Sequence, residues 1–156
     1  MLIWVRFDAP LPWTNQNLDA WWASAIHGVD FRGDAQLSYC CAPGGVVVIQ
    51  TSNLYVLTAT DGAVFAAVRG LTALYIHEAR HNEGYIHTCT TGERAGQNDN
   101  TIAELGAWGV QYYFLLWLGN HANPGLLSPT MRLDSTQEAE SMKTRFFCRL
   151  SASPAP

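Results

Sequence analysis

Residues 77–87 have the sequence His77-Glu78-Ala79-Arg80-His81-Asn82-Glu83-Gly84-Tyr85-Ile86-His87. In a helix, His77 and His81 project from one face because they are four residues apart, and both rings can bind one ion. Gly84 can end the helix, since glycine adopts backbone angles that other residues avoid, and His87 can then turn back as a third ligand. Glu78 lies beside this set, where it could polarise a metal-bound water. Three protein ligands with one open position are typical of catalytic zinc, so the stretch predicts a catalytic zinc site.

The spacing of these residues, H-E-x-x-H-x-x-G-x-x-H, resembles the zinc signature of the metzincin clan of metallopeptidases, a group of zincins. The resemblance implies that His77, His81 and His87 bind one zinc ion. It also implies that Glu78 acts as the general base and then as the general acid. The fold that it implies is a small zincin-like domain, in which a sheet packs on the helix that carries the first two histidines.

Two further residues bear on this resemblance. Metzincins have a methionine-containing turn beneath the metal, downstream of the third histidine. Met131 is the best placed candidate for that turn, whereas Met142 falls in an expected helix. Arg80 stands where metallopeptidase signatures usually carry an uncharged residue. We expect its side chain to point away from the metal and to pair with an acidic neighbour.

Glu104 is an alternative third metal ligand. Another zincin group takes its third ligand from a glutamate on a second helix downstream, and Glu104 lies near the start of such an expected helix. Thr101 and Glu104 also match a capping box, in which the glutamate bonds the amides of its own helix. Either Glu104 or Asp99 could instead accept a hydrogen bond from a ligand histidine and orient its ring.

The four cysteines are Cys40, Cys41, Cys89 and Cys148, an even number that permits disulfides. We expect the adjacent pair not to bridge itself, so that any pairing would run to Cys89 or Cys148. Cys89 lies two residues after His87, where a disulfide would brace the metal loop. Direct metal ligation by Cys89 is the less favoured alternative, because three histidines already complete a catalytic set.

Length and charge restrict the class of protein. The chain has 156 residues, 48% of them apolar, which predicts one domain over residues 1–150 and a frayed tail over 151–156. The net charge is -4 and Lys143 is the sole lysine, so we expect no basic patch and no binding to nucleic acid. The sequence leaves the oligomeric state open.

The N-terminal sequence gives no sign of a secretory signal, because its apolar run is short and Asp8 follows closely. Both a cytoplasmic protein and a secreted one whose signal has been removed fit this sequence. The apolar run 112–118 belongs to an expected helix that also contains Glu104 and Gln111, so we expect no membrane span.

Apolar periodicity predicts an α+β fold, with a short sheet or hairpin packed on the active-site helix, a long buried helix and a C-terminal helix. The expected strands are residues 2–8, 46–50 and 54–58, the last two joined as a hairpin by 51–53. The expected helices are residues 18–26, 63–82, 101–120 and 135–147. Asn17 is the expected cap of the first helix, and Asp134 or Ser135 that of the last.

The leading functional hypothesis is a peptidase with one Zn²⁺ ion that hydrolyses a peptide or protein substrate through an activated water, with Glu78 as the base. A free sheet edge could receive the substrate as an added strand. The first alternative is a metal-dependent hydrolase of a non-peptide amide or ester. The second is a non-catalytic module that binds a metal ion.

Overall fold

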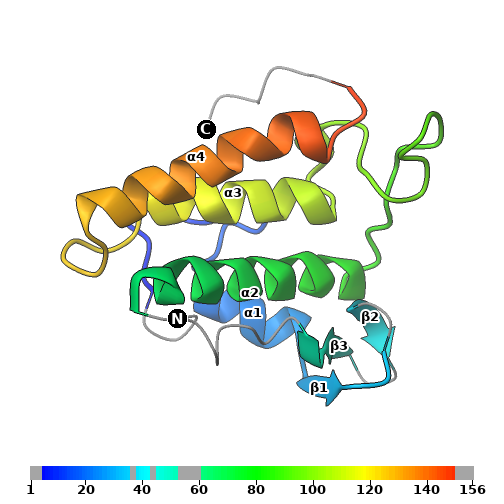
Figure 1. Ribbon diagram of the computed structural model, residues 1–156, viewed down its shortest axis with the longest axis horizontal. Helices are drawn as coiled ribbons and strands as arrows, with labels where there is room; N and C mark the ends of the chain where they lie inside the picture. The colour runs from blue at the N-terminus through cyan, green and yellow to red at the C-terminus, as the bar shows by residue number, and fades with distance from the viewer. Residues whose placement is uncertain (1–4, 36–37, 43–44, 53–60, 150–156) are drawn as a thin grey trace.

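The computed structural model describes residues 5–35, 38–42, 45–52 and 61–149, and these form an α+β fold (Figure 1). In chain order the helices and strands are α1 Leu18–Ala25, β1 Gly28–Arg32, β2 Tyr39–Ala42, β3 Val46–Gln50, α2 Asp61–Asn82, the 3-10 helix η2 Ile102–Glu104, α3 Ala107–Asn120 and α4 Pro129–Arg145. Helices α2, α3 and α4 are stacked one above another, and the sheet lies near the C-terminal end of α2 (Figure 1). The expected fold class is confirmed, whereas the expected tail 151–156 lies outside the described residues.

Helix α3 forms the centre of the core. It is apolar on nearly all sides because it packs against α2 on one side and α4 on the other. At Gly119, an added Cβ would come within 2.9 Å of the Arg132 carbonyl oxygen, so the glycine lets α3 and α4 approach closely. Across the described ranges, no helix combines the length and the hydropathy needed to cross a membrane.

Helix α2 carries the signature, and its bounds agree closely with the expected 63–82. Ala73, Ile76 and Ala79 are buried in the core, and their spacing of three residues defines the inward face of the helix. Because this face is fixed by packing, the two histidines of the helix have a fixed direction as well.

Strand β3 is the central strand of the sheet. It pairs in parallel with β1, from Gly28 opposite Val46 to Arg32 opposite Gln50, and antiparallel with β2. The expected strand 46–50 is therefore confirmed, and Val47, Val48 and Ile49 are buried. The sequence did not predict β1 and β2. The expected strand 54–58 lies outside the described residues, as does the end of the hairpin loop that was expected to lead into it.

The strand expected over residues 2–8 does not form in its described part. Phe7 makes a single antiparallel bridge with Ala122, at the end of α3. Val5 and Phe7 are buried in the helical core, and this packing replaces pairing with the sheet. Asn17 caps α1 as predicted, since its Oδ1 accepts a hydrogen bond from the Leu18 N–H at 2.9 Å.

The helix expected over residues 101–120 is interrupted. The 3-10 helix η2 is followed by Leu105, which has a left-handed φ of 52°, and α3 begins two residues after Leu105. The Arg80 Nε donates to the Leu105 carbonyl oxygen at 2.8 Å and holds this break against α2. The expected capping box is wrong, because the Thr101 side chain makes no capping hydrogen bond among the described residues and the Thr88 hydroxyl donates to Glu104 instead.

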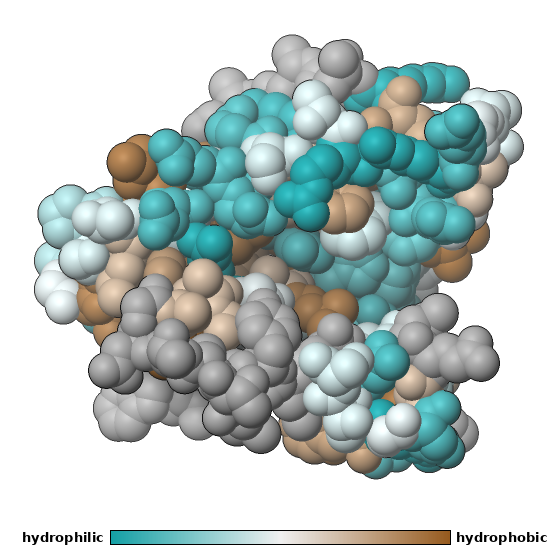
Figure 2. Space-filling model, in the orientation of Figure 1, coloured by the Kyte–Doolittle hydropathy of each residue, from teal (hydrophilic) through white to brown (hydrophobic). Residues whose placement is uncertain are grey.

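Helix α4 begins at Pro129, earlier than the expected residue 135. Ser128 is its cap, since its Oγ accepts from the Met131 N–H at 3.3 Å, and proline fits the first helical position. The expected caps Asp134 and Ser135 are therefore wrong. Buried residues recur along the face of α4 that packs on α3: Ser135, Ala139 and Met142. Its outer face is mainly hydrophilic, as Figure 2 shows across the top of the molecule.

Met131 lies in the first turn of α4, so the expected methionine turn is wrong. This turn lies at the C-terminal end of α3, where the Arg132 Nη1 donates to the Gly119 carbonyl oxygen at 3.3 Å. Trp108, which contacts the His77 ring, lies at the other end of α3. Gly119 lies eleven positions after Trp108, which corresponds to about 16 Å along the helix axis.

Two disulfides join the four cysteines. The bridge between Cys89 and Cys148 braces the metal loop as expected for Cys89, but its partner is Cys148 and not one of the adjacent pair. The second bridge joins Cys40 to Cys41, which contradicts the expectation that neighbours would not pair. Adjacent residues of a regular strand point to opposite faces. Here the pairing of β2 with β3 is irregular between Tyr39 and Ala42, and the φ of Cys41 is 65°, which breaks that alternation.

Candidate metal centre

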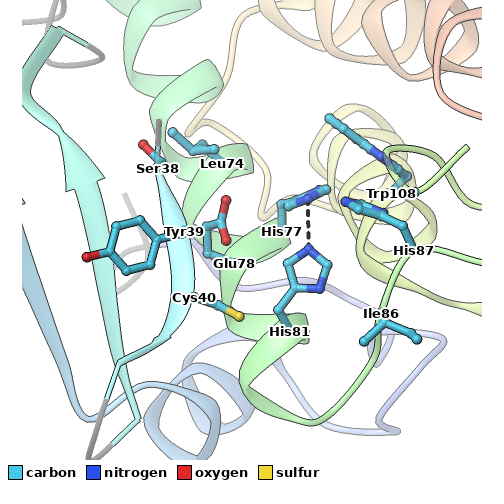
Figure 3. A pocket seen from close by; sticks show the side chains of 11 residues that line it. Ser38, Tyr39, Cys40, Leu74, His77, Glu78, His81, Ile86, His87 and Trp108 are labelled. Atoms are coloured by element: carbon cyan, nitrogen blue, oxygen red, sulfur yellow. Dashed lines mark hydrogen bonds between the residues drawn. The ribbon is translucent and has the colours of Figure 1, made fainter. Parts of the chain in front are cut away.

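The three histidines of the signature converge at the C-terminal end of α2 (Figure 3). Ligand nitrogens of His77, His81 and His87 all lie within 4.8 Å of one another, close enough to bind one metal ion. The two Nε2 atoms of His77 and His81 are 3.2 Å apart. The structure thus brings together the three histidines that the sequence predicted as ligands, in a geometry loosely compatible with a zincin-like motif.

Helix α2 positions the first two ligands. His77 is 4% exposed, and its ring contacts the Trp108 ring from α3 with centroids 4.1 Å apart. The His81 Nδ1 lies 2.5 Å from the Tyr85 carbonyl oxygen, so Nδ1 carries the proton and Nε2 is left as the donor atom. One helix and the turn after it therefore orient both rings.

The third ligand comes from the loop after α2. Gly84 has a φ of 91°, which ends the helix and turns the chain as the sequence predicted. The His87 ring then faces the Trp108 ring, with centroids 5.9 Å apart and planes inclined by 19°. The His87 Nδ1 lies 3.0 Å from Oδ1 of the buried Asp99, which leaves its Nε2 for a metal ion.

The protonation states of the rings suit a metal ion. Burial lowers the pKa of His77 well below its ordinary value, with smaller contributions from His81 and His87 and an opposing one from Gln111. Burial also lowers the pKa of His81, against a hydrogen bond to the Tyr85 backbone. Both rings are therefore neutral at pH 7, which is the form that ligates metals. A set of three imidazoles suits zinc and also copper, iron and nickel.

Glu78 lies beside the histidines, on the wall between α2 and β2 (Figure 3). Burial raises the pKa of its carboxyl group from 4.5 to about 7, and the nearby His87 opposes this shift. A carboxyl group that titrates near neutral pH can accept a proton and return it during one reaction.

The site opens into a cleft of about 630 Å³. Its lining residues are Ser38, Tyr39, Cys40, Leu74, His77, Glu78, His81, Ile86, His87, Gly96 and Trp108. One wall is β2, an outer strand of the described sheet. Ile86 and Trp108 belong to the opposite side, and Ile86 is 76% exposed. A ligand in this cleft would contact both β2 and the metal-binding nitrogens.

The structure favours His87 over Glu104 as the third ligand. Glu104 is exposed and accepts a hydrogen bond from the Thr88 hydroxyl, outside the group of histidines. Cys89 forms a disulfide with Cys148, so it braces the loop and does not offer a thiolate to a metal ion.

Arg80 points away from the cluster, as predicted. Its Nη1 lies 2.6 Å from Glu83 Oε2, and its Nε bonds the Leu105 carbonyl oxygen. The guanidinium also lies 3.4 Å from the centre of the Tyr85 ring. Arg80 therefore ties the last turn of α2 to the following turn and to the start of α3.

Two parts of the site were missed by the sequence reasoning. Trp108 was assigned to the apolar face of a buried helix, and its aromatic ring alone gave no sign that it would contact two histidines. The segment Ser38–Cys40 was not assigned to a strand, because its polar and cysteine residues give no clear strand pattern. Both parts reach the site through packing between elements distant in the chain.

The site therefore combines three imidazole donors, a buried carboxyl group and an open cleft. These parts come from α2, the loop after it, the start of α3 and the outer strand β2. Comparison of the chain with models of protein families, with curated proteins and with solved structures found no match.

Proposed function

We propose that this protein is a zinc-dependent peptidase. The observation that carries the proposal is the convergence of His77, His81 and His87, with nitrogens within 4.8 Å of one another, beside the buried carboxyl group of Glu78. In this proposal the three histidines hold one Zn²⁺ ion. The ion would supply a water molecule with a pKa near 7 and a positive charge for the developing oxyanion.

The protein groups perform the proton transfers. Glu78 takes a proton from the attacking water, and its pKa of about 7 suits a base that acts near neutral pH. The same carboxyl group then returns the proton to the leaving amine. The neutral rings of His77 and His81 keep their lone pairs available at this pH, because burial lowers the pKa of both.

A catalytic role is supported over a structural one by the number and setting of the ligands. Structural zinc sites are usually closed by four protein ligands, whereas catalytic sites keep one position open. Three histidines form the group in the described residues, and they border an open cleft. This arrangement leaves room for a water molecule and a substrate carbonyl group.

A peptide substrate is supported by the position of β2. This strand is at the edge of the described sheet, and its residues Tyr39 and Cys40 line the cleft. An extended peptide can pair with an exposed strand through main-chain hydrogen bonds, which would hold it alongside the metal ion.

The test compares the wild-type protein with Glu78→Gln, both purified without a histidine tag and loaded with zinc. Wild-type protein should cleave members of a mixed peptide library, and a chelator should stop the cleavage. Glu78→Gln should lose roughly 100-fold or more in kcat/KM because the base is absent, while it still binds one zinc ion. His121→Gln is the matched control, since His121 lies outside the cluster and pairs with Asp8.

Undiminished cleavage by Glu78→Gln would contradict the proposed mechanism. A panel of esters and non-peptide amides, assayed in parallel, separates the peptidase from the other hydrolases. If the wild-type protein turns over these compounds and no peptide, the metal chemistry stands and the peptide substrate does not. Zinc binding without any turnover would identify a non-catalytic metal-binding module.

A further inference from the structure

Asp99 is a buried residue whose side chain and backbone contact three parts of the molecule. The side chain is fully buried, and its Oδ1 lies 3.0 Å from the His87 Nδ1. Its Oδ2 accepts a hydrogen bond from the backbone N–H of Trp108 at 2.9 Å, in the first turn of α3. Its backbone carbonyl oxygen accepts from the Cys148 N–H at 3.0 Å. The carboxylate therefore connects His87 to the start of α3, and the backbone carbonyl oxygen of the same residue adds the segment after α4.

His87 depends on such a contact more than the other two ligands do. His77 and His81 are fixed by α2, whose inward face is packed in the core. His87 belongs to a loop, and its neighbour Ile86 is largely exposed. A ring on a loop can rotate and can carry its proton on either nitrogen, unless a partner selects one arrangement.

A carboxylate selects one tautomer of its histidine partner. Since the Asp99 carboxylate is an acceptor, the His87 Nδ1 must carry the proton and donate it. The His87 Nε2 then has a free lone pair, which is the form needed for metal ligation. The second oxygen prevents rotation of the carboxylate, because it is held by the Trp108 N–H.

Gly106 provides the space that this arrangement needs. A Cβ at this position would lie 2.6 Å from Asp99 Oδ2 and 3.0 Å from its Cγ. Any larger residue would therefore push the carboxylate from its place. Asp99 also lies at the N-terminal end of α3, where the first backbone N–H groups have no acceptor within the helix and favour a negative charge.

We infer that Asp99 is the positioning residue of the third ligand: it holds His87 in the Nδ1-protonated form, directs its Nε2 to the cluster and couples it to the start of α3. The inference rests on the proposed role of the three histidines as metal ligands. It requires no particular substrate, so it can be tested without an assay of hydrolysis.

The first experiment measures zinc affinity by competition with a chromophoric chelator. Asp99→Asn should bind zinc 10–100-fold more weakly than the wild-type protein, since it replaces the charged acceptor by a neutral amide. Asn100→Ala is the matched control: it removes a hydrogen bond in the same loop, from the Asn100 side chain to the Thr88 carbonyl oxygen, and leaves the hydrogen bond between His87 and Asp99 in place. Its zinc affinity should equal that of the wild-type protein.

A double-mutant cycle separates positioning from general support of the fold. If Asp99 acts through His87, Asp99→Asn should cost no further zinc affinity in a His87→Ala background. An equal loss in both backgrounds would overturn the inference. Should Asp99→Asn fail to fold, Gly106→Ala provides the second variant, because it retains the aspartate but displaces its carboxylate. It should weaken zinc binding in the same direction.

The second experiment uses the metal-free protein and nitrogen-15 NMR of the histidine rings. The wild-type His87 should show a proton on Nδ1, and Asp99→Asn should shift the ring toward the Nε2-protonated form. A wild-type ring protonated on Nε2 overturns the inference even if zinc binds. Conversely, absence of zinc binding by the wild-type protein would defeat the proposed function, while the tautomer would still decide the role of Asp99.

Discussion

Burial acts on two neighbouring residues of the site in opposite directions. It raises the pKa of Glu78 to about 7 and lowers that of His77, because both charged forms lose hydration. Each shift suits the proposed chemistry, since the carboxyl group can hold a proton near neutral pH and the imidazole can stay unprotonated. Both shifts lower the free energy of unfolding at a pH at which the same group would be charged in the unfolded chain.

Glu78→Gln should therefore stabilise the metal-free protein above pH 7. The folded-state pKa of Glu78 is raised from 4.5, so its contribution to stability is present below pH 4.5 and is lost as the pH rises through about 7. A neutral glutamine avoids this loss, and the gain should approach roughly 3 kcal/mol. Urea denaturation at pH 8 with a chelator measures it, and a variant less stable than the wild type would contradict the expectation.

At the level of elements, the disulfide between Cys89 and Cys148 holds the metal loop to the end of α4. The backbone N–H of Cys148 bonds the Asp99 carbonyl oxygen, and that of Cys89 bonds the Asn98 carbonyl oxygen. The disulfide joins residues 59 apart in the chain, so it restricts a long loop of the unfolded chain.

Replacing both of these cysteines by alanine should lower the free energy of unfolding by about 2–4 kcal/mol. It should also weaken zinc binding, because the loop that carries His87 loses its connection to the C-terminal segment. The matched control replaces Cys40 and Cys41 by alanine. Their disulfide closes almost no loop, so its removal should change the unfolding free energy far less. Similar losses in the two variants, measured by urea denaturation, would argue against this account.

Local sequence signals predicted the helices better than the sheet. The apolar spacing in α2 and the Asn17 cap of α1 gave nearly correct bounds, since both depend on residues close in the chain. Strands β1 and β2 are short and depend on pairing with β3, which no local pattern reveals. The break at Leu105 was missed for the same reason, because leucine favours helices and the Arg80 contact comes from another helix.

The grouping of the three histidines could be predicted because they form a local motif, whereas the rest of the site could not. His77 and His81 share one helix face, and Gly84 supplies the turn to His87. Trp108 reaches these rings from α3, through the packing of two helices. Such contacts depend on the whole arrangement of the core, which one sequence does not specify in detail.

For the whole molecule, the buried histidines predict a stability that depends on pH. The folded-state pKa values of His77 and His81 are lowered from 6.5, so the unfolded chain binds more protons below that pH. Their contribution to stability is therefore lost as the pH falls below 6.5. Glu78 has the opposite sign between pH 4.5 and about 7, so its effect must be removed before the two can be compared.

The metal-free Glu78→Gln variant isolates the contribution of the histidines. The urea concentration at the midpoint of its unfolding should decrease when the pH is lowered from 7 to 5. Adding His77→Gln should make this decrease smaller. A midpoint that stays constant would contradict the expected burial of a neutral imidazole. Zinc in excess at pH 7 should raise the midpoint according to its concentration relative to the dissociation constant.

The length of α3 separates the end of the molecule that holds the histidine cluster from a remote end. Its first turn contacts the histidines, and its last turn contacts the start of α4, about 16 Å away along the axis. Leu133, in that part of α4, is 56% exposed. A surface label, an affinity handle or an immobilising linker placed there would leave the cleft accessible, which makes this end of the molecule suited to attachment in binding and turnover measurements.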